Sequence, residues 1–156
     1  MEKKETHGIL EEIIKLIHNF IFNPEATDRS IDAVYIFGSV LNQSQFKKNS
    51  DIDIAFLIDK LLYKQDALKA SVDAYIIATK IGLTLDRSTD VIIMNSASIE
   101  TAFQIMTTGI PVYEHHPDKR IEYEIAVKGM YYDFKPFLDD LRSKAVLELN
   151  QHQEKL

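Results

Sequence analysis

Two aspartates, Asp51 and Asp53, stand at the start of an apolar run that continues to Ile58. Residues two apart on a β-strand point to the same face, so we expect both carboxylates on one side of a strand. Placing unpaired like charges at the mouth of a buried strand is costly, and a divalent ion would remove their repulsion. Carboxylate oxygens suit Mg²⁺, so the pair predicts a magnesium site.

A glycine-serine pair, Gly38-Ser39, precedes these aspartates by the eleven residues 40–50. Backbone N–H groups at the start of a helix bind phosphate oxygens, and glycine allows close approach of the backbone. Taken alone, Gly-Ser is more often a simple turn with a helix cap, and an Asp pair is more often a solvated strand end. Their combination favours a metal beside a phosphate, which is typical of nucleotide chemistry.

A third carboxylate is needed near the pair if two metal ions act in phosphoryl transfer. Asp90 is the best candidate, because it opens the apolar segment 91–94 as Asp53 opens its own strand. Asp86 is the alternative. For either residue, the competing interpretation is an ordinary turn residue.

The elements that must position these residues alternate along the chain. Apolar spacing and capping or turn residues predict helices at 7–22, 39–46, 61–81 and 98–108 with a long helical region from 118, and strands at 31–37, 52–58, 83–86, 90–94 and 110–113. This order predicts the α+β class, with one mixed β-sheet, flanking helices and a C-terminal helix. Pro111 places the last strand at a sheet edge.

Within the helix predicted at 61–81, six residues fall on one side, and Gly82 is expected to end it: Leu61, Leu68, Val72, Tyr75, Ile76 and Thr79. Five aromatic residues near the C-terminus are expected to pack in part and in part to form a partner interface: Tyr123, Tyr131, Tyr132, Phe134 and Phe137. The adjacent His115 and His116 are expected on a surface loop rather than as zinc ligands.

The composition favours one globular domain over residues 1–156, since 46% of the chain is hydrophobic and 27% is charged. No apolar run is long enough to cross a membrane, and no export signal is expected in the mixed-charge start of the sequence. The sequence has no cysteine, which excludes disulfides and thiolate metal sites and is compatible with the cytoplasm. The net charge of −6 argues against a nucleic-acid partner. Self-association stays open.

The residues described above resemble the minimal nucleotidyltransferase (MNT) branch of the DNA polymerase β superfamily, which is paired in prokaryotic operons with HEPN-domain proteins. The family pattern is Gly-Ser, a spacer, Asp-x-Asp and a third aspartate on a later strand. Here these are Gly38-Ser39, Asp51-Ile52-Asp53 and Asp90. The resemblance covers residues 30–115, and the helices expected at 7–22 and 118–156 flank this core.

The resemblance implies a role for each of these residues. Asp51 and Asp53 would bind two Mg²⁺ ions together with the triphosphate of ATP. Asp90 would bind one ion and help to activate the attacking hydroxyl. Gly38 and Ser39 would hold the β- and γ-phosphates.

The sequence also departs from the family pattern between these motifs. The spacer is one residue longer than usual, and residues 40–44 lack the family's Arg-Gly pair. Phosphate binding would then be weaker or would shift to Lys47 and Lys48, although exposed lysines are more often simply solvated. Ser50 is expected to support the turn before Asp51.

The resemblance implies transfer of a nucleoside monophosphate, expected to be AMP, from the triphosphate to an acceptor hydroxyl. The expected acceptor is a tyrosine of a HEPN toxin, with this chain as the antitoxin. One alternative is a small-molecule acceptor such as an aminoglycoside-like antibiotic, although residues 118–156 offer only one or two helices for such a substrate. The other is a binding module that neutralises its partner without catalysis.

Overall fold

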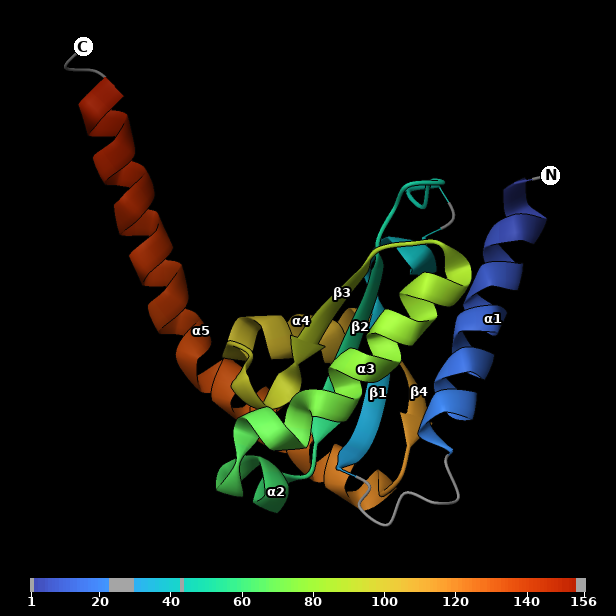
Figure 1. Ribbon diagram of the computed structural model, residues 1–156. Helices are drawn as coiled ribbons and strands as arrows, with labels where there is room; N and C mark the ends of the chain where they lie inside the picture. The colour runs from blue at the N-terminus through green and yellow to red at the C-terminus, as the bar shows by residue number, and fades with distance from the viewer. Residues whose placement is uncertain (1, 23–29, 43, 154–156) are drawn as a thin grey trace.

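The computed structural model describes residues 2–22, 30–42 and 44–153, and Figure 1 shows their arrangement. The elements are, in chain order, α1 (Glu2–Ile21), β1 (Ile31–Phe37), the 3₁₀ turn η1 (Gly38–Leu41), β2 (Ile52–Ile58), α2 (Lys60–Gln65), α3 (Ala67–Leu85), β3 (Thr89–Ile93), the 3₁₀ turn η2 (Met94–Ser96), α4 (Ile99–Thr108), β4 (Ile110–Glu114) and α5 (Pro117–Gln153).

The four strands form one sheet in the order β3-β2-β1-β4. β1 is antiparallel to β2 and to β4, whereas β2 and β3 are parallel. The predicted mixed sheet is therefore confirmed, and β1 and β2 have the predicted bounds. β4 lies at an edge of the sheet, as predicted. There the missing backbone N–H of Pro111 does not interrupt hydrogen bonding between central strands.

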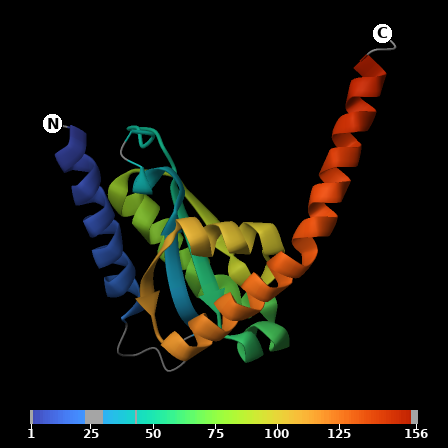
Figure 2. The same cartoon turned by 180° about the vertical axis from the view of Figure 1, so that it is seen from behind.

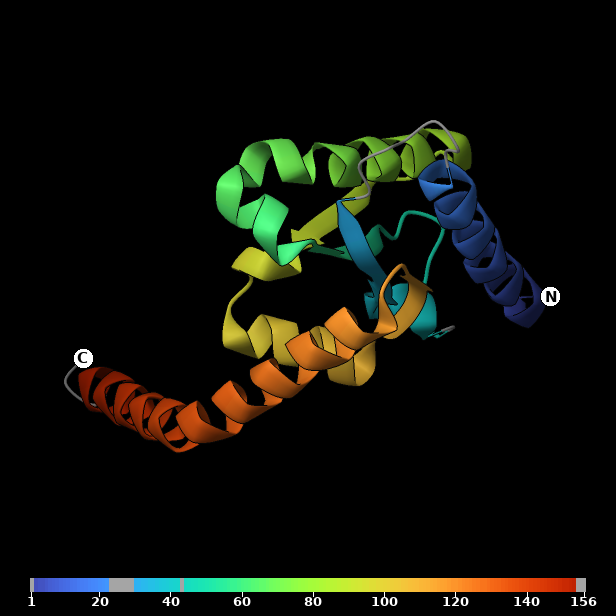
Figure 3. The same cartoon turned by 90° about the horizontal axis from the view of Figure 1, so that it is seen from below.

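The sheet is covered on both faces, as Figure 3 shows from below, with α1 and α3 on one side and α4 and α5 on the other. Strand alternation divides β2 between the two cores: Ile54 and Phe56 belong to the α1–α3 side, and Ala55 and Leu57 belong to the α4–α5 side. Figure 2 shows the second face, where α4 and the first half of α5 lie over the strands. β2 is thus buried on both faces, which fixes the position of the polar residues at its start.

The helix predicted over 39–46 is wrong, because only the short turn η1 forms there. The backbone of Asn42 is extended, with φ −119° and ψ 100°, and its side-chain Oδ1 accepts hydrogen bonds from the N–H and the hydroxyl of Ser44. A side chain that bonds to its own backbone two residues on competes with helix formation.

The strand predicted over 83–86 is also wrong, because α3 continues through Leu85. The alternation of Leu83, Thr84 and Leu85 resembles a strand, but Gly82 lies inside the helix rather than ending it. The helix ends at Asp86, which takes the left-handed conformation with φ 50°.

The helix predicted over 61–81 is divided into α2 and α3 at Asp66. The backbone of Asp66 is extended, and its side chain accepts a hydrogen bond from Lys69 N–H as the N-cap of α3. α3 places small residues such as Ala70, Ala74 and Ala78 against the core. The six residues predicted to share a side do not form the core face; five of them are large, apolar and exposed, namely Leu61, Leu68, Val72, Tyr75 and Ile76.

The long C-terminal helix α5 leaves the body of the protein in its second half (Figure 1) and contains Pro136, which lacks a backbone N–H donor. Near its start, Tyr123 donates a hydrogen bond to the Met94 carbonyl, and Tyr131 stacks on Phe103 at 3.7 Å between ring centroids. The other three aromatic residues of the predicted interface are exposed: Tyr132, Phe134 and Phe137. None of the helices described here is both long and apolar enough to cross a membrane.

Candidate active site

The strand register brings two of the three predicted carboxylates together. Asp53 on β2 is paired with Phe37 at the end of β1 and, on its other side, with Asp90 on β3. Asp51 lies one residue before β2 and is exposed, whereas Asp53 is half-buried. Asp90, rather than the alternative Asp86, is the acid in register with Asp53, because Asp86 ends α3 before β3 begins.

Gly38 closes the site from the β1 side. Its φ is +75°, a conformation that side chains rarely adopt, and a Cβ placed there would overlap the Asp53 carboxylate oxygen Oδ2 and lie 3.0 Å from Asp53 Cγ. Ser39 follows within η1 and is half-buried. Glycine is therefore required by both backbone conformation and space, and it places the start of η1 directly against the Asp53 carboxylate.

Asp53 carries an unfavourable charge in this setting. Burial raises the pKa of its carboxyl, and the neighbouring carboxylates of Asp90 and Asp51 raise the pKa further. The fold therefore holds three acidic side chains close enough to repel one another at one end of the sheet. Such an arrangement is unfavourable unless a positive charge offsets it.

The opposite end of the sheet shows how acids are compensated elsewhere in this protein. There Lys119 Nζ donates to Asp59 Oδ2 at 2.5 Å and lies 3.6 Å from Asp32 Oδ1. The hydrogen bond from Lys119 is the main reason that the pKa of Asp59 lies below its usual value. The pKa of Asp53, by contrast, is shifted upward by burial and by two carboxylates, which is the pattern of a site prepared for a cation.

The loop before Asp51 is held by its own hydrogen bonds and by Arg87. The Ser50 hydroxyl accepts a hydrogen bond from Lys47 N–H at 2.8 Å, which closes the loop. Arg87 Nη1 donates to the carbonyl oxygens of Lys47 and Ser50, both at 3.0 Å, and the guanidinium lies 4.5 Å from the centroid of the Phe46 ring. Asp51 thus follows directly on an anchored segment.

Arg87 is a positioning residue that the sequence did not reveal. Its partners lie 37 and 40 residues earlier in the chain, so no local pattern points to them. The only local signal was its place next to Asp86, the alternative third acid, in a segment that could also be an ordinary turn. Arg87 also borders a hollow of about 250 Å³ together with Lys48, Asn49, Ser50, Asp86 and Ser88.

Replacement of Arg87 by lysine is expected to lower the rate of catalysis by about 10-fold at saturating nucleotide and to lower stability slightly. Lysine keeps the charge but cannot hold two carbonyl oxygens in the fixed geometry of a guanidinium, so the loop before Asp51 loosens. Steady-state kinetics that separate kcat from KM will measure this effect. A purely structural role for Arg87 would lower the melting temperature and leave kcat of the folded fraction unchanged.

Within the described part of the chain, no group of three or more His, Cys, Asp or Glu side chains is placed so that it could hold a metal ion by itself. Mg²⁺ usually takes one or two protein carboxylates and completes its shell with water and substrate phosphates. The acidic pair in register, Asp53 and Asp90, with Asp51 beside it, fits that incomplete donor set. Lys47 and Lys48 are exposed on the same loop.

The geometry agrees with the family comparison. The family model described as "Polymerase beta, Nucleotidyltransferase" matches residues 19–118, which is more than half of the chain. The chain therefore belongs to this family and is a nucleotidyltransferase, as its Gly-Ser and Asp-x-Asp motifs predict. The comparison with curated proteins finds no match.

Solved structures of toxin-antitoxin proteins have a similar fold. A chain from a toxin-antitoxin crystal structure with AMP-PNP is 25% identical with a TM-score of 0.55, and the match covers 85% of this chain and 97% of that one. A chain from the toxin-antitoxin MntA-HepT is 23% identical with a TM-score of 0.50, covering 85% and 95%. A complex of a tri-AMPylated Shewanella oneidensis HEPN toxin with its MNT antitoxin contains a chain 22% identical, with a TM-score of 0.50, covering 91% and 99%. The last two likenesses concern the fold alone.

Proposed function

We propose that this nucleotidyltransferase moves AMP from ATP to a tyrosine hydroxyl on a HEPN-type partner protein and thereby acts as an antitoxin. The observation that carries the proposal is the register of Asp53 beside Asp90, with Gly38 packed against the Asp53 carboxylate. The similar toxin-antitoxin structure with AMP-PNP supports ATP as the nucleotide. The complex of similar fold in which the HEPN toxin is tri-AMPylated supports a protein acceptor.

In the proposed reaction the acceptor hydroxyl oxygen attacks the α-phosphorus of ATP. The bond from the α-phosphorus to the oxygen bridging the β-phosphate breaks, and pyrophosphate leaves with the bonding electrons. In this proposal Asp90, which is exposed near the start of an edge strand, accepts the proton of the attacking hydroxyl. The work of the protein is therefore positioning and electrostatic stabilisation rather than covalent catalysis.

The proposed Mg²⁺ ligands are Asp51, Asp53 and Asp90. Bound Mg²⁺ would supply positive charge that stabilises the triphosphate as its α–β bond breaks. In this proposal Gly38 and Ser39 bind the β- and γ-phosphates through backbone N–H groups, and Lys47 binds the same anion. Ser50 contributes by closing the loop that leads to Asp51.

A labelling experiment tests this function. The full chain is incubated with Mg²⁺ and α-³²P-labelled ATP, first with the purified product of the neighbouring gene and then with total cell lysate. The Asp51→Asn/Asp53→Asn double variant serves as the inactive comparison. Asp59→Asn is the matched control, because Asp59 lies at the opposite end of the sheet and pairs with Lys119.

Label on a protein band with the wild type and Asp59→Asn, and not with the double variant, supports the proposal. Label that appears only in the small-molecule fraction overturns the protein acceptor and favours an antibiotic-like substrate. Absence of label in every fraction, with the partner still neutralised by the double variant, overturns catalysis and favours a binding module.

A further inference from the structure

The outward face of α3 has an unusual composition for a surface helix. Its buried side is lined largely by small residues, whereas its large apolar side chains point to solvent. Leu68 and Leu83 are each 79% exposed, and Val72, Tyr75 and Ile76 are between 44% and 51% exposed. Together with the exposed Thr79, these residues form what we call the α3 stripe. A continuous apolar surface of this kind marks an interaction site more often than scattered exposed residues do.

The α3 stripe follows a single face over its whole length. Its members recur at spacings of three, four and one residue, so they stay on the same side of a helix with 3.6 residues per turn. No member of the stripe is charged. The charged residues Lys69, Asp73 and Lys80 lie along one flank of the stripe. Protein interfaces usually have a polar rim of this kind.

The spacing of the α3 stripe is the same read in either direction. Leu68 and Leu83 lie at equal distances from the point between Tyr75 and Ile76, as do Val72 and Thr79. A second copy of α3 packed antiparallel across a two-fold axis at that point would place each residue opposite its counterpart. Self-complementarity of one surface about an axis is the defining property of a two-fold homodimer. A different partner would impose no such symmetry on the stripe.

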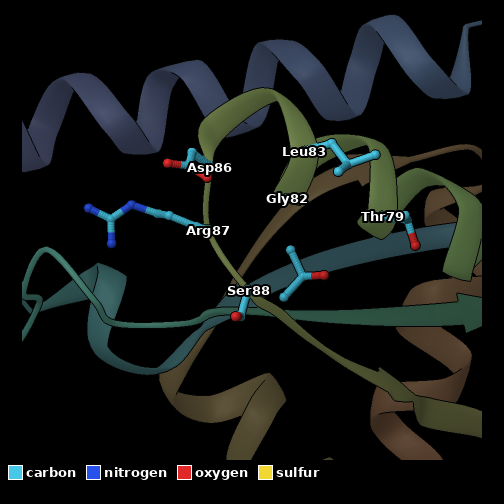
Figure 4. Close-up of a pocket in the computed structure, with 7 residues that line it drawn as sticks. Thr79, Gly82, Leu83, Asp86, Arg87 and Ser88 are labelled. Atoms are coloured by element: carbon cyan, nitrogen blue, oxygen red, sulfur yellow. The ribbon is translucent and has the colours of Figure 1, made fainter.

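The shape of the surface fits the same arrangement. At the C-terminal end of the stripe is a hollow of about 430 Å³, lined by Thr79, Gly82 and Leu83 of α3 and by residues 86–89 (Figure 4). A Cβ placed on Gly82 would lie 2.7 Å from the Arg87 carbonyl oxygen, so α3 packs directly against the loop that borders the hollow. In an antiparallel pair the other copy's Leu68, the most exposed apolar residue at the opposite end, falls beside Leu83 and can enter the hollow.

We propose that a second copy of this chain covers the α3 stripe, giving a two-fold dimer with antiparallel α3 helices. The stripes of two copies together expose on the order of 1,000 Å² of apolar side-chain surface, about the least that a specific interface buries. The dimer is therefore expected to dissociate in the micromolar range. It does not depend on nucleotide transfer, because no residue of the stripe belongs to the acidic site.

The first test measures molar mass by light scattering from low to several hundred micromolar full-length protein. The wild type is expected to shift from monomer to dimer over this range. Ile76→Glu, which places two like charges next to the axis, is expected to weaken association at least about 10-fold. Leu147→Glu on α5 is the matched control, since Leu147 is 60% exposed and remote from α3 in sequence. Circular dichroism and thermal unfolding confirm that both variants fold.

The second test fixes the direction of the helices with cysteines, which is clean because the chain has none of its own. Val72→Cys mixed with Thr79→Cys is expected to form an intermolecular disulfide on mild oxidation, while Val72→Cys alone is not. In the antiparallel pair Val72 of one copy lies opposite Thr79 of the other. The two Val72 positions are therefore separated by about 10 Å along the helix axis, too far for a disulfide. Crosslinking of Val72→Cys with itself would instead indicate parallel helices and overturn the proposed arrangement.

A chain that stays monomeric at every concentration would also overturn the proposal. So would a dimer that Leu147→Glu disrupts and Ile76→Glu does not, because the interface would then lie on α5. If the wild type is monomeric alone and Ile76→Glu prevents binding of the HEPN-type protein, a different protein covers the stripe and the homodimer is excluded.

Discussion

Replacement of Asp53 by asparagine is expected to abolish nucleotide transfer and at the same time to raise the melting temperature at neutral pH. Asparagine fills the same space but removes a negatively charged ligand from the proposed Mg²⁺ site, so a loss of about 10³-fold in rate is expected. The gain in stability follows from the charge, because Asp90 and Asp51 repel the ionised Asp53 and burial disfavours it. Activity assays and thermal unfolding of the same preparations measure both effects.

The sign of the stability effect depends on pH in a defined way. In the folded protein the pKa of Asp53 lies above its ordinary value of 3.8. Between these two pKa values the folded state still binds a proton that the unfolded chain has lost. Stability therefore falls as the pH rises from below 3.8 through the raised pKa, and the penalty is fully present once the pH lies above that raised pKa. The advantage of Asp53→Asn should accordingly shrink as the pH is lowered toward the ordinary range of aspartate.

Asp59→Asn provides the control of opposite sign. The Lys119 contact holds the pKa of Asp59 below its ordinary value, so this carboxylate stabilises the fold at neutral pH and that stability is lost in acid. Asp59→Asn is expected to lower the melting temperature and to leave transfer unchanged. A variant Asp53→Asn that retains activity, or that unfolds more easily than the wild type at neutral pH, would contradict the proposed role of the acidic site.

Gly38→Ala is expected to have the second-largest effect, lowering both stability and activity. The φ of +75° costs about 1–2 kcal/mol for a residue with a Cβ. The added methyl group would also displace the Asp53 carboxylate, which it overlaps, and a misplacement of about 1 Å at a catalytic centre can cost about 10²-fold in rate. Urea unfolding and initial rates with ATP will separate the two losses.

Gly129→Ala is the matched control for this glycine. Gly129 lies inside α5, and no atom would lie within 4 Å of a Cβ placed there. Alanine is the better helix former, so a gain of up to about 1 kcal/mol and unchanged activity are expected. Full activity in Gly38→Ala would show that the Asp53 carboxylate does not need the space that glycine leaves.

The central strands were predictable because their sequence constrains them twice. Apart from Asp32 and Asp53, residues 31–37 and 52–58 are apolar on both faces, which suits strands in the middle of a covered sheet, and their bounds are those of β1 and β2. The sequence also indicated Gly38, Asp51 and Asp53, whose motif is local. Asp90 was expected near the pair because it opens an apolar segment, but its register opposite Asp53 could not be predicted, since a parallel register depends on the crossover through α2 and α3.

The features that the sequence did not reveal depend on contacts between distant segments or on side-chain size. Arg87 reaches carbonyl groups some forty residues away, which no periodicity records. In α3, apolar residues occupy both sides, so spacing alone cannot say which side is buried. The structure places Ala70, Ala74 and Ala78 inward together with Ile77 and Ile81, and the small alanines let α3 lie close to the sheet.

Intact-mass spectrometry of the HEPN-type partner tests the central claim most directly. The partner is incubated with ATP, Mg²⁺ and either the wild type or Asp53→Asn, and the site of any added mass is mapped by peptide fragmentation. We expect the wild type to add one or more AMP groups to a tyrosine and Asp53→Asn to add none. An unmodified partner in the presence of folded, ATP-binding wild-type protein would contradict the proposed transfer, as would equal modification by both proteins.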